Sequence, residues 1–228
     1  TENSRRYLLS EGIDGKTIFV IGSPMREVIN DHMDSILKSN VLESLKLEKG
    51  KYILLSSHRE ENIDLEDKFL ELMNSINFIA EKYQLPIIYS VHPRSKKFIE
   101  ARGFKFHPLV KQLQPFGFSD YVHLQMNAFC VLSDSGTLSE ESAMLGFPAV
   151  LIRTSTERPE ALDNGSIIIG GVKQKDVEQA VELAVSMANN NEKISIPFDY
   201  RDDNVSTKVV KIIQSYTEIV NLTVWQKE

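Results

Sequence analysis

The stretch FCVLSDSGTLSEESAMLGFPAV, residues 129–150, predicts a strand, a helix and the start of a second strand. An apolar run at 129–132 is followed by small hydroxyl residues and Gly136, then by a helical segment at 138–145 and a second apolar run at 149–152. Short, continuous apolar runs bounded by turn residues are typical of buried strands. Two such strands joined by a helix form a parallel βαβ unit, so this stretch favours an α/β fold.

The same alternation extends through the rest of the chain. Further strands are expected at 17–21, 52–57, 86–91 and 166–171, and helices at 2–12, 65–83, 93–102, 175–189 and 205–221. The helix at 65–83 is expected to bury a broad apolar face made of Leu65, Phe69, Leu72, Met73, Ile76, Phe78, Ile79 and Tyr83. Strands and helices that alternate at this spacing predict a doubly wound parallel sheet.

We expect one α/β domain over residues 50–200, preceded by linking helices at 25–49 and followed by a C-terminal helix within 201–228. The helix and strand expected at 1–24 are interpreted as the remnant of a preceding domain, against which their apolar residues would pack. The chain opens on Thr1 in what reads as the middle of a domain, so the sequence is interpreted as a fragment of a longer protein.

The composition argues against several classes of protein. The chain has 228 residues, of which 42% are hydrophobic and 25% charged, as in ordinary soluble proteins. A net charge of −6 and a pI of about 5.5 argue against a nucleic-acid partner. Cys130 is the single cysteine, so no disulfide can form within the chain, and it is expected to be buried. We find no signal peptide and no apolar run of the roughly 18 residues that a membrane span needs, so we expect a cytoplasmic protein without a membrane partner.

Polar loops follow four of the expected strands directly. Their sequences are SSHREEN (56–62), HPRSKK (92–97), SDSGTLSEE (133–141) and RTSTERPE (153–160). In open α/β sheets, ligands bind beyond the carboxyl ends of the strands. Because the carboxyl ends of parallel strands lie at one edge of the sheet, these loops predict a polar pocket there.

The loop at 133–141 has the features of an anion site. Gly136 tolerates unusual backbone angles and lets a ligand approach the main chain closely. The N–H groups of 136–138 are expected at a helix N-terminus, where phosphate is favoured. Ser135 can add a hydroxyl donor, and Glu141 can accept hydrogen bonds from a ribose diol. The alternative is that Asp134 or Ser135 only caps the helix, and this loop alone does not decide between the two.

Two of the five histidines directly follow expected strands, and for these, His58 and His92, a functional role is as plausible as a structural one. Structural roles are expected for His32, His107 and His123. No HExxH or CxxC pattern accompanies any of them, so no metal site is expected. Arg158 could clamp a diphosphate, or the segment ERPEA could simply be a turn into a helix with Pro159 at its first position.

Two motifs resemble one known family. SSHREEN resembles the T-x-H-R-R-E-N signature of the non-hydrolysing UDP-N-acetylglucosamine 2-epimerases. DSGTLSEESAMLGFPAVLIRTSTERPEAL resembles that family's D-S-G-G-x-Q-E-E-A-x-x-L-G-x-P-V-L-x-x-R-x-x-T-E-R-P-E. The two motifs have the family's separation, and the similarity runs from residue 1 to about residue 220. Within the family, the chain is most similar to the capsule and O-antigen branch, which acts on UDP-2-acetamido-2,6-dideoxy-L-talose to form UDP-N-acetyl-L-fucosamine.

The resemblance implies a GT-B-like fold of two Rossmann-like halves, of which this chain would be the C-terminal half. It implies an isomerase that inverts C2 of a UDP-N-acetylhexosamine without a cofactor, by eliminating UDP and adding it back after a proton returns on the other face. The complete protein is expected to form a homodimer. The alternatives are a GT-B glycosyltransferase, which would need an acceptor, and a non-catalytic domain that binds nucleotide-sugars.

The resemblance also implies roles for individual residues in substrate binding. Ser135 and Gly136 would bind phosphate, and Glu141 would bind the ribose hydroxyls. The main chain at Tyr121 would meet the uracil, and Arg158 would complete the polar wall.

For catalysis, the resemblance places His58 beside the diphosphate or the sugar. In some members the loop that contains His58, Arg59 and Glu61, together with the position of His92, contacts a second, activating UDP-sugar. The main catalytic carboxylates of the family would lie upstream of residue 1, so the chain alone is expected to bind UDP weakly and to catalyse nothing.

Three residues depart from the family pattern. Glu60 stands in place of arginine, Thr137 in place of the second glycine and Ser139 in place of glutamine. They bear on the second nucleotide and on the identity of the sugar rather than on UDP itself.

Overall fold

The structure is a computed structural model that describes residues 1–192 and 194–227. The chain divides into two compact units. The smaller unit comprises Thr1–Asp31 and Pro197–Glu228, and the larger one comprises His32–Ile196. No helix among the described residues is both long and apolar enough to cross a membrane.

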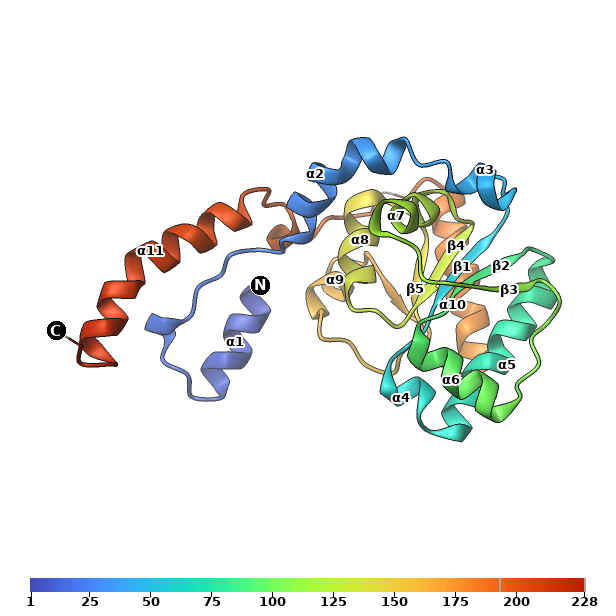
Figure 1. Cartoon of the computed structure of the whole chain (residues 1–228), viewed down its shortest axis with the longest axis horizontal. Coiled ribbons are helices and arrows are strands. Elements are labelled where there is room, and N and C mark those ends of the chain that lie inside the picture. Colours follow the sequence, from blue (N-terminus) through green and yellow to red (C-terminus); the bar gives the residue numbers. More distant parts are fainter. Residues whose placement is uncertain (193, 228) are drawn as a thin grey trace. The chain divides into compact units, whose positions relative to one another are not determined.

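The larger unit is built on a six-stranded parallel sheet with the order β3-β2-β1-β4-β5-β6 (Figure 1). The strands are β1 (Ile53–Ser56), β2 (Ile87–Ser90), β3 (Val110–Leu113), β4 (Cys130–Ser133), β5 (Ala149–Leu151) and β6 (Ile168–Ile169). This is the strand order of a Rossmann-like sheet, so the predicted doubly wound α/β fold is confirmed. The order reverses between β1 and β4, which makes this pair the topological switch point.

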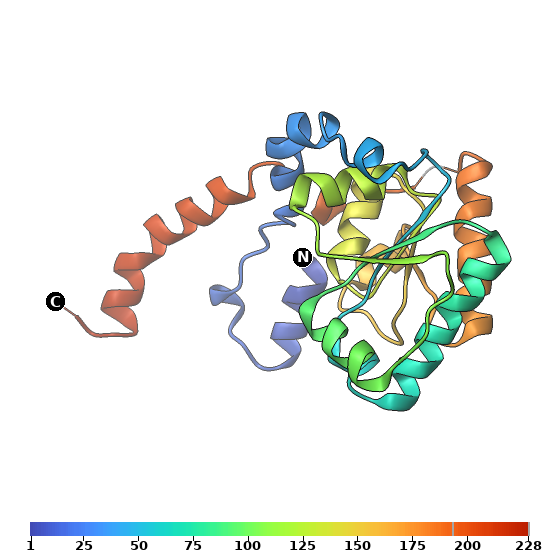
Figure 2. The ribbon, with the colours of Figure 1, turned by 45° about the vertical axis from the view of Figure 1, so that its right-hand side comes forward.

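Helices cover both faces of the sheet (Figures 1 and 2). Along β1 and β4, alternate residues point to opposite faces. One face packs against α5 (Glu66–Tyr83) and α10 (Gln174–Asn189), and Cys130 is buried in this core, as predicted. The other face lies under α7 (Phe118–Asn127) and α8 (Thr137–Leu145), and the Tyr52 hydroxyl donates to the carbonyl oxygen of Leu124 at 2.6 Å. Shorter or peripheral helices are α3 (Val41–Leu45), α4 (Glu60–Ile63), α6 (Pro93–Arg102) and α9 (Pro159–Asp163).

The apolar face of α5 is mostly as predicted. The fully buried residues are Phe69, Leu72, Met73, Ile76 and Ile79, whereas Phe78 and Tyr83 are half-buried at its margin. Leu65 was wrongly assigned to this face and is 63% exposed. It precedes the first turn of the helix as the N-cap, so its side chain does not follow the helical stripe.

Three predictions about strands differ from the structure. The strand expected at 166–171 is shorter, since β6 is Ile168–Ile169. Residues 17–21 were expected to form a strand, but the structure has a 3-10 turn, η1 (Gly15–Thr17), and none of residues 18–21 lies in a strand. Conversely, β3 was not predicted. It pairs with β2 at the edge of the sheet, where Lys111 and Gln112 are exposed and interrupt the apolar pattern.

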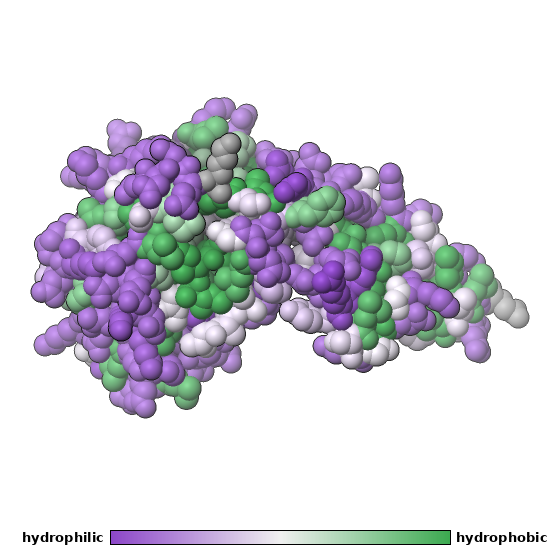
Figure 3. Space-filling model, turned by 180° about the vertical axis from the view of Figure 1, so that it is seen from behind, coloured by the Kyte–Doolittle hydropathy of each residue, from purple (hydrophilic) through white to green (hydrophobic). Residues whose placement is uncertain are grey.

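The smaller unit contains α1 (Glu2–Ser10), a 3-10 turn, η2 (Phe198–Tyr200), and α11 (Val205–Thr223), while α2 (Met25–Leu37) begins in it and ends in the larger unit. Hydrogen bonds join its two chain segments: Ser23 N–H donates to Asp199 O at 2.8 Å, and Ser206 N–H donates to Glu27 at 2.8 Å. In α11, Val205 is buried, whereas Val210 is 64% exposed. Figure 3 shows hydrophobic residues on the surface of both units.

Candidate functional site at the switch point

The carboxyl ends of β1 and β4 lie next to each other, with Ser56 paired to Ser133. The loops that follow these strands are therefore adjacent, and Asp134 N–H donates to Ser56 O at 3.2 Å. These are the loops that contain the two motifs found in the sequence. The ends of β1 and β4 thus bring both motifs to one place.

Asp134 organises the loop after β1. Its carboxylate is fully buried and accepts hydrogen bonds from the N–H groups of His58 and Arg59, both at 2.9 Å. The Ser57 hydroxyl at 2.8 Å and the Asn62 side-chain amide at 3.2 Å also donate to it. The sequence suggested Asp134 or Ser135 as a cap of the following helix, but the N-cap of α8 is Gly136, and no side-chain cap bond is seen among the described residues. Asp134 connects two loops instead.

Gly136 begins α8 beneath two arginine side chains. Its φ is −62°, an ordinary helical value, so the tolerance of glycine for unusual backbone angles is not used here. A Cβ at this position would lie 3.4 Å from Arg158 Nη1 and 3.7 Å from Arg59 Nη2. Both guanidinium groups therefore lie close to the N-terminus of α8, at ordinary van der Waals distance from the position of a Cβ. Positive charge from the helix dipole and from both arginines gathers here, which favours an anion.

The predicted hydroxyl donors lie at the same point. Ser135 is half-buried, and its Oγ is 3.0 Å from Thr137 Oγ1. Leu138 N–H, expected to face the anion, donates to Ser135 O over a long 3.3 Å. Thus Ser135, Gly136 and Thr137 lie together at the N-terminus of α8, where they form the rim of the candidate anion site.

A network of arginines and acids surrounds this rim. Arg158 donates from Nε to Glu140 Oε1 at 2.7 Å. Arg153 is only 2% exposed and donates from Nε to Glu61 at 2.8 Å. Its two other nitrogens bind the Glu157 carboxylate at 2.7 and 2.8 Å, which lowers the pKa of Glu157 to about 2. Arg153 was not singled out from the sequence.

The residues expected at a second nucleotide site have partners within the chain. Glu61 binds Arg153, and Arg59 Nη1 lies 3.5 Å from Glu157. His92 is the N-cap of α6, and its Nδ1 accepts from Arg94 N–H at 3.3 Å.

Glu60, which reverses the charge of the family pattern, has its own local partner. Its carboxylate accepts from Arg94 Nη1 at 2.9 Å, and Arg94 also binds Asp64 at 2.7 Å. The reversed charge is therefore compensated by a neighbouring cation rather than left facing the anion site.

His58 lies at the open side of the switch point. Its side chain is 39% exposed, and its Nδ1 is 3.4 Å from Asp134 Oδ1. The His92 ring is next to it, with 5.5 Å between the ring centroids.

Glu141 is buried on α8, and Tyr121 is half-buried on α7. Glu141 is 7% exposed, and burial raises the pKa of its carboxyl group. The side-chain amide of Gln125 donates to it at 2.5 Å, and the Thr137 hydroxyl also bonds to it. The N–H of Tyr121, whose main chain was expected to meet uracil, donates to Gly117 O within α7 at 2.9 Å. Its hydroxyl hydrogen-bonds to Ser56 and Ser133, so the side chain reaches the switch point.

Ser139, the third departure from the family pattern, is fully buried on α8. Its hydroxyl has no hydrogen-bond partner among the described residues. It therefore lies inside the fold and not on the rim of the anion site.

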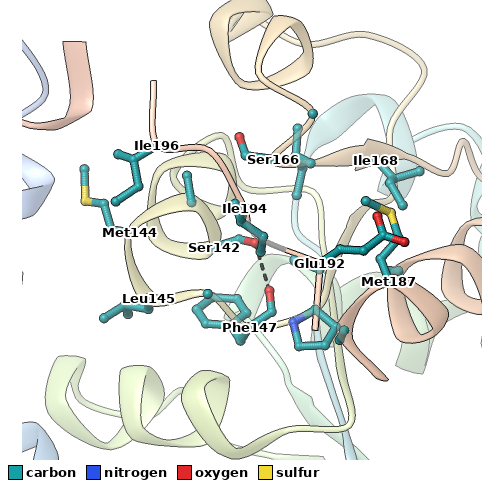
Figure 4. A pocket seen from close by; sticks show the side chains of 18 of the residues that line it. Ser142, Met144, Leu145, Phe147, Ser166, Ile168, Met187, Glu192, Ile194 and Ile196 are labelled. Atoms are coloured by element: carbon teal, nitrogen blue, oxygen red, sulfur yellow. Dashed lines mark hydrogen bonds between the residues drawn. The ribbon is translucent and has the colours of Figure 1, made fainter. Parts of the chain in front are cut away.

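A cavity of about 540 Å³ lies at the opposite, amino edge of the sheet (Figure 4). Its walls are mostly apolar and include Leu145, Phe147 and Met187. The Ser142 hydroxyl in its wall donates to Phe147 O at 2.9 Å. None of the predicted site residues lines this cavity. Within the described part of the chain, no group of three or more His, Cys, Asp or Glu side chains could hold a metal ion.

The chain matches known proteins over most of its length. Residues 1–214 match the family model described as UDP-N-acetylglucosamine 2-epimerase. A UDP-N-acetylglucosamine 2-epimerase from Methanococcus maripaludis is 32% identical over 220 residues, which cover 93% of this chain and 59% of that protein. The chain thus spans about 60% of the length of the curated relatives that it matches.

Solved structures have the same fold. A UDP-N-acetylglucosamine 2-epimerase from Rickettsia bellii is 40% identical with a TM-score of 0.86, covering 100% of this chain and 61% of that one. The enzyme from Methanocaldococcus jannaschii, solved with UDP-GlcNAc and UDP, is 30% identical with a TM-score of 0.84, covering 94% of this chain and 59% of that one. Both the sequence and the fold match UDP-N-acetylglucosamine 2-epimerases over nearly the whole chain, and the chain belongs to the UDP-N-acetylglucosamine 2-epimerase family.

Proposed function

We propose that this chain is the UDP-binding half of an isomerase that inverts C2 of a UDP-N-acetylhexosamine. The reaction would eliminate UDP, return a proton to the opposite face of C2 and add UDP back. The observation that carries the proposal is the anion site, where Arg59 and Arg158 lie over Gly136 at the N-terminus of α8. Such a site suits a diphosphate, which must be held through both steps while it is not bonded to the sugar.

The remaining parts of the nucleotide fit the groups around the anion site. Glu141 would accept hydrogen bonds from the ribose hydroxyls, in exchange for the bonds that it now receives from Gln125 and Thr137. Tyr121 would lie near the uracil. His58 would stand beside the diphosphate or the sugar, where a ring nitrogen can bind or move a proton.

The identity of the sugar is a narrower proposal that rests on the resemblance of the motifs. Two substrate pairs fit: UDP-GlcNAc with UDP-ManNAc, and UDP-2-acetamido-2,6-dideoxy-L-talose with UDP-N-acetyl-L-fucosamine. Either reaction would serve capsule or O-antigen polysaccharide synthesis, in a cytoplasmic enzyme that forms a homodimer when complete. The C-terminal half of a GT-B-like protein would bind the nucleotide, and the catalytic carboxylates would belong to the part of the relatives' length that this chain does not cover.

Titration of UDP tests the nucleotide site in the 228-residue chain. The amide signals of Ser135 and Gly136 should shift in NMR spectra as UDP is added. Arg158→Gln should weaken binding by about tenfold, because a hydrogen bond to a charged group is worth about 1.5–3 kcal/mol. Lys82→Gln is the matched control, since Lys82 is also paired with carboxylates, those of Glu178 and Glu182, but lies on α5 away from the switch point. Equal affinities in both variants would contradict the site.

Solvent exchange tests the reaction. In deuterated water, this chain alone should neither exchange the C2 proton of UDP-GlcNAc nor release UDP, since general acid–base groups contribute about 10²–10⁴-fold to a rate. Joined to the upstream half of a relative, it should do both. Exchange catalysed by this chain alone would show that the catalytic groups have been assigned to the wrong half.

A further inference from the structure

We propose that Asp134 is a positioning residue that holds His58 with Nδ1–H directed at its carboxylate and the Nε2 lone pair directed at the ligand. This rests on the proposed function, in which His58 stands beside the diphosphate or the sugar. Asp134 itself is fully buried and would touch no ligand. It would act through the backbone and the ring of His58.

The Asp134 carboxylate accepts hydrogen bonds from four groups of the loop after β1. Two backbone N–H groups, a hydroxyl and a side-chain amide all donate to Oδ2 within 3.2 Å. The other oxygen, Oδ1, accepts from His58 N–H at 3.1 Å and faces the His58 ring, and an asparagine that kept its carbonyl oxygen at the Oδ2 position would put an N–H₂ group there instead. A buried carboxylate with this many partners is held rigidly.

Two of these donors are the main-chain N–H groups on either side of the His58 side chain. The N–H groups of His58 and Arg59 both bind Asp134, which fixes the backbone from which the imidazole projects. Asn62 donates from the same Nδ2 to Asp134 and to Ile152 O at 2.9 Å, so the loop is also tied to the end of β5. The position of His58 is therefore set by β1, β4 and β5 together.

The ring of His58 faces the same carboxylate. Its Nδ1 lies 3.4 Å from Asp134 Oδ1, while the side chain as a whole is 39% exposed. The nitrogen that faces an anion carries the proton, so the other nitrogen keeps its lone pair. A contact of this length is long for a hydrogen bond, and such contacts commonly shorten when a ligand binds. His58 would thus present Nε2 as an acceptor that can take up a proton.

Nitrogen-15 NMR of the imidazole tests the proposal on the 228-residue chain without nucleotide, at about pH 8.5, where an ordinary imidazole is neutral. We expect the Nδ1–H tautomer of His58 in the wild type. In Asp134→Asn, we expect a shift to the Nε2–H tautomer, and about tenfold faster hydrogen exchange at the His58 and Arg59 amides, since each loses a charged acceptor.

Ser57→Ala is the matched control. It removes another donor from the same carboxylate, Ser57 Oγ at 2.8 Å, but leaves the Asp134 side chain beside His58. The tautomer should stay Nδ1–H in this variant. If Asp134→Asn does not fold, the wild-type tautomer and the Ser57→Ala spectrum decide the question alone.

Three results would overturn the proposal: an Nε2–H tautomer in the wild type, an unchanged tautomer in folded Asp134→Asn, or the same tautomer shift in Ser57→Ala. None of these measurements involves a nucleotide. Failure of the chain to bind UDP would therefore contradict the proposed function without affecting the tautomer result.

Discussion

The guanidinium group of Arg153 makes two hydrogen bonds, of 2.7 and 2.8 Å, to the carboxylate of Glu157 four residues later. The two side chains differ sharply in burial, because Arg153 is 2% exposed and Glu157 is 53% exposed. Removing one partner or the other therefore has different consequences. The charge that remains is buried in one case and solvated in the other.

We expect Glu157→Ala to destabilise the protein more than Arg153→Met. The first change leaves a buried guanidinium with Glu61 as its remaining partner and should cost about 2 kcal/mol of unfolding free energy. The second leaves two carboxylates that water can reach and should cost about 1 kcal/mol or less. Urea unfolding measures both values. If Arg153→Met were the more destabilising change, the Arg153–Glu157 pair would not be what holds the loop after β5.

The same pair should make stability depend on pH. The pKa of Glu157 is lowered from 4.5 to about 2 by its bonds to Arg153. A carboxylate whose pKa is lowered by folding stabilises the fold at pH values above its pKa in the unfolded state. This contribution is lost as the pH falls from about 4.5 towards 2. Because Glu157 is exposed to solvent, we expect no more than about 1 kcal/mol. The difference in unfolding free energy between wild type and Glu157→Gln should shrink over this range, and a constant difference would refute the assignment.

Gly136→Ala and Gly146→Ala should have opposite effects. At Gly136 the backbone is helical, so alanine should change stability by less than about 1 kcal/mol, but its methyl group would fill the space between the helix N-terminus and Arg158 that the diphosphate would use, and weaken UDP binding by about tenfold. At Gly146 the φ is +76° and no atom lies within 4 Å of an added Cβ. Alanine there should cost about 1 kcal/mol of stability and leave UDP binding unchanged. Thermal unfolding and calorimetry with UDP measure the two effects.

Glu141→Gln should gain stability and lose affinity. Burial raises the pKa of Glu141 above its ordinary value. The contribution of the Glu141 side chain to stability is therefore fully present at pH values below its pKa in the unfolded state, near 4.5. It is lost as the pH rises through the pKa of the group in the folded state. At pH 7 the neutral amide should be more stable by about 1 kcal/mol, and the gain should vanish at about pH 4.

The affinity of Glu141→Gln for UDP should fall by about one to two decades, since a hydrogen bond to a charged group is lost. Comparing two ligands, UDP and 2′-deoxy-UDP, in the wild type and the variant localises the effect to the ribose. In the wild type, UDP should bind more tightly than 2′-deoxy-UDP, and in Glu141→Gln the two should bind alike. An undiminished preference for UDP in the variant would remove Glu141 from the ribose site.

The sequence predicts those parts of the fold in which each element carries its own signal. The helix at 93–102 has the predicted bounds, because Pro93 starts it and Gly103 ends it in a left-handed conformation. The strands β1, β2, β4 and β5 are found within one residue of their predicted ends, because their apolar runs are buried on both faces of the sheet. An edge strand has one neighbour and tolerates polar residues such as Lys111, which is why β3 could not be recognised.

In the site, the sequence predicts which loops meet but not which side chains bind one another. Asp134 was interpreted as a cap because a helix follows it in the chain. Its true partners, His58 and Arg59, come from a loop 75 and 76 residues earlier. Arg153 was missed for the same reason, since one of its carboxylate partners, Glu61, lies 92 residues away in the chain. Such contacts are decided by the strand order, which no local pattern encodes.

The switch-point strands are neighbours in space although the chain between them contains β2, β3 and the helices α4 to α7. Closing so long a loop is a slow event in folding, and contacts of high sequence separation are commonly among the last to form. While a ribosome is still making β4, Asp134 is not yet there to bind the loop after β1, and α8 is not yet there to form the anion site. Competence to bind a nucleotide must therefore arise late and in one step, so that nucleotide binding during refolding would report completion of the sheet rather than the formation of any single element.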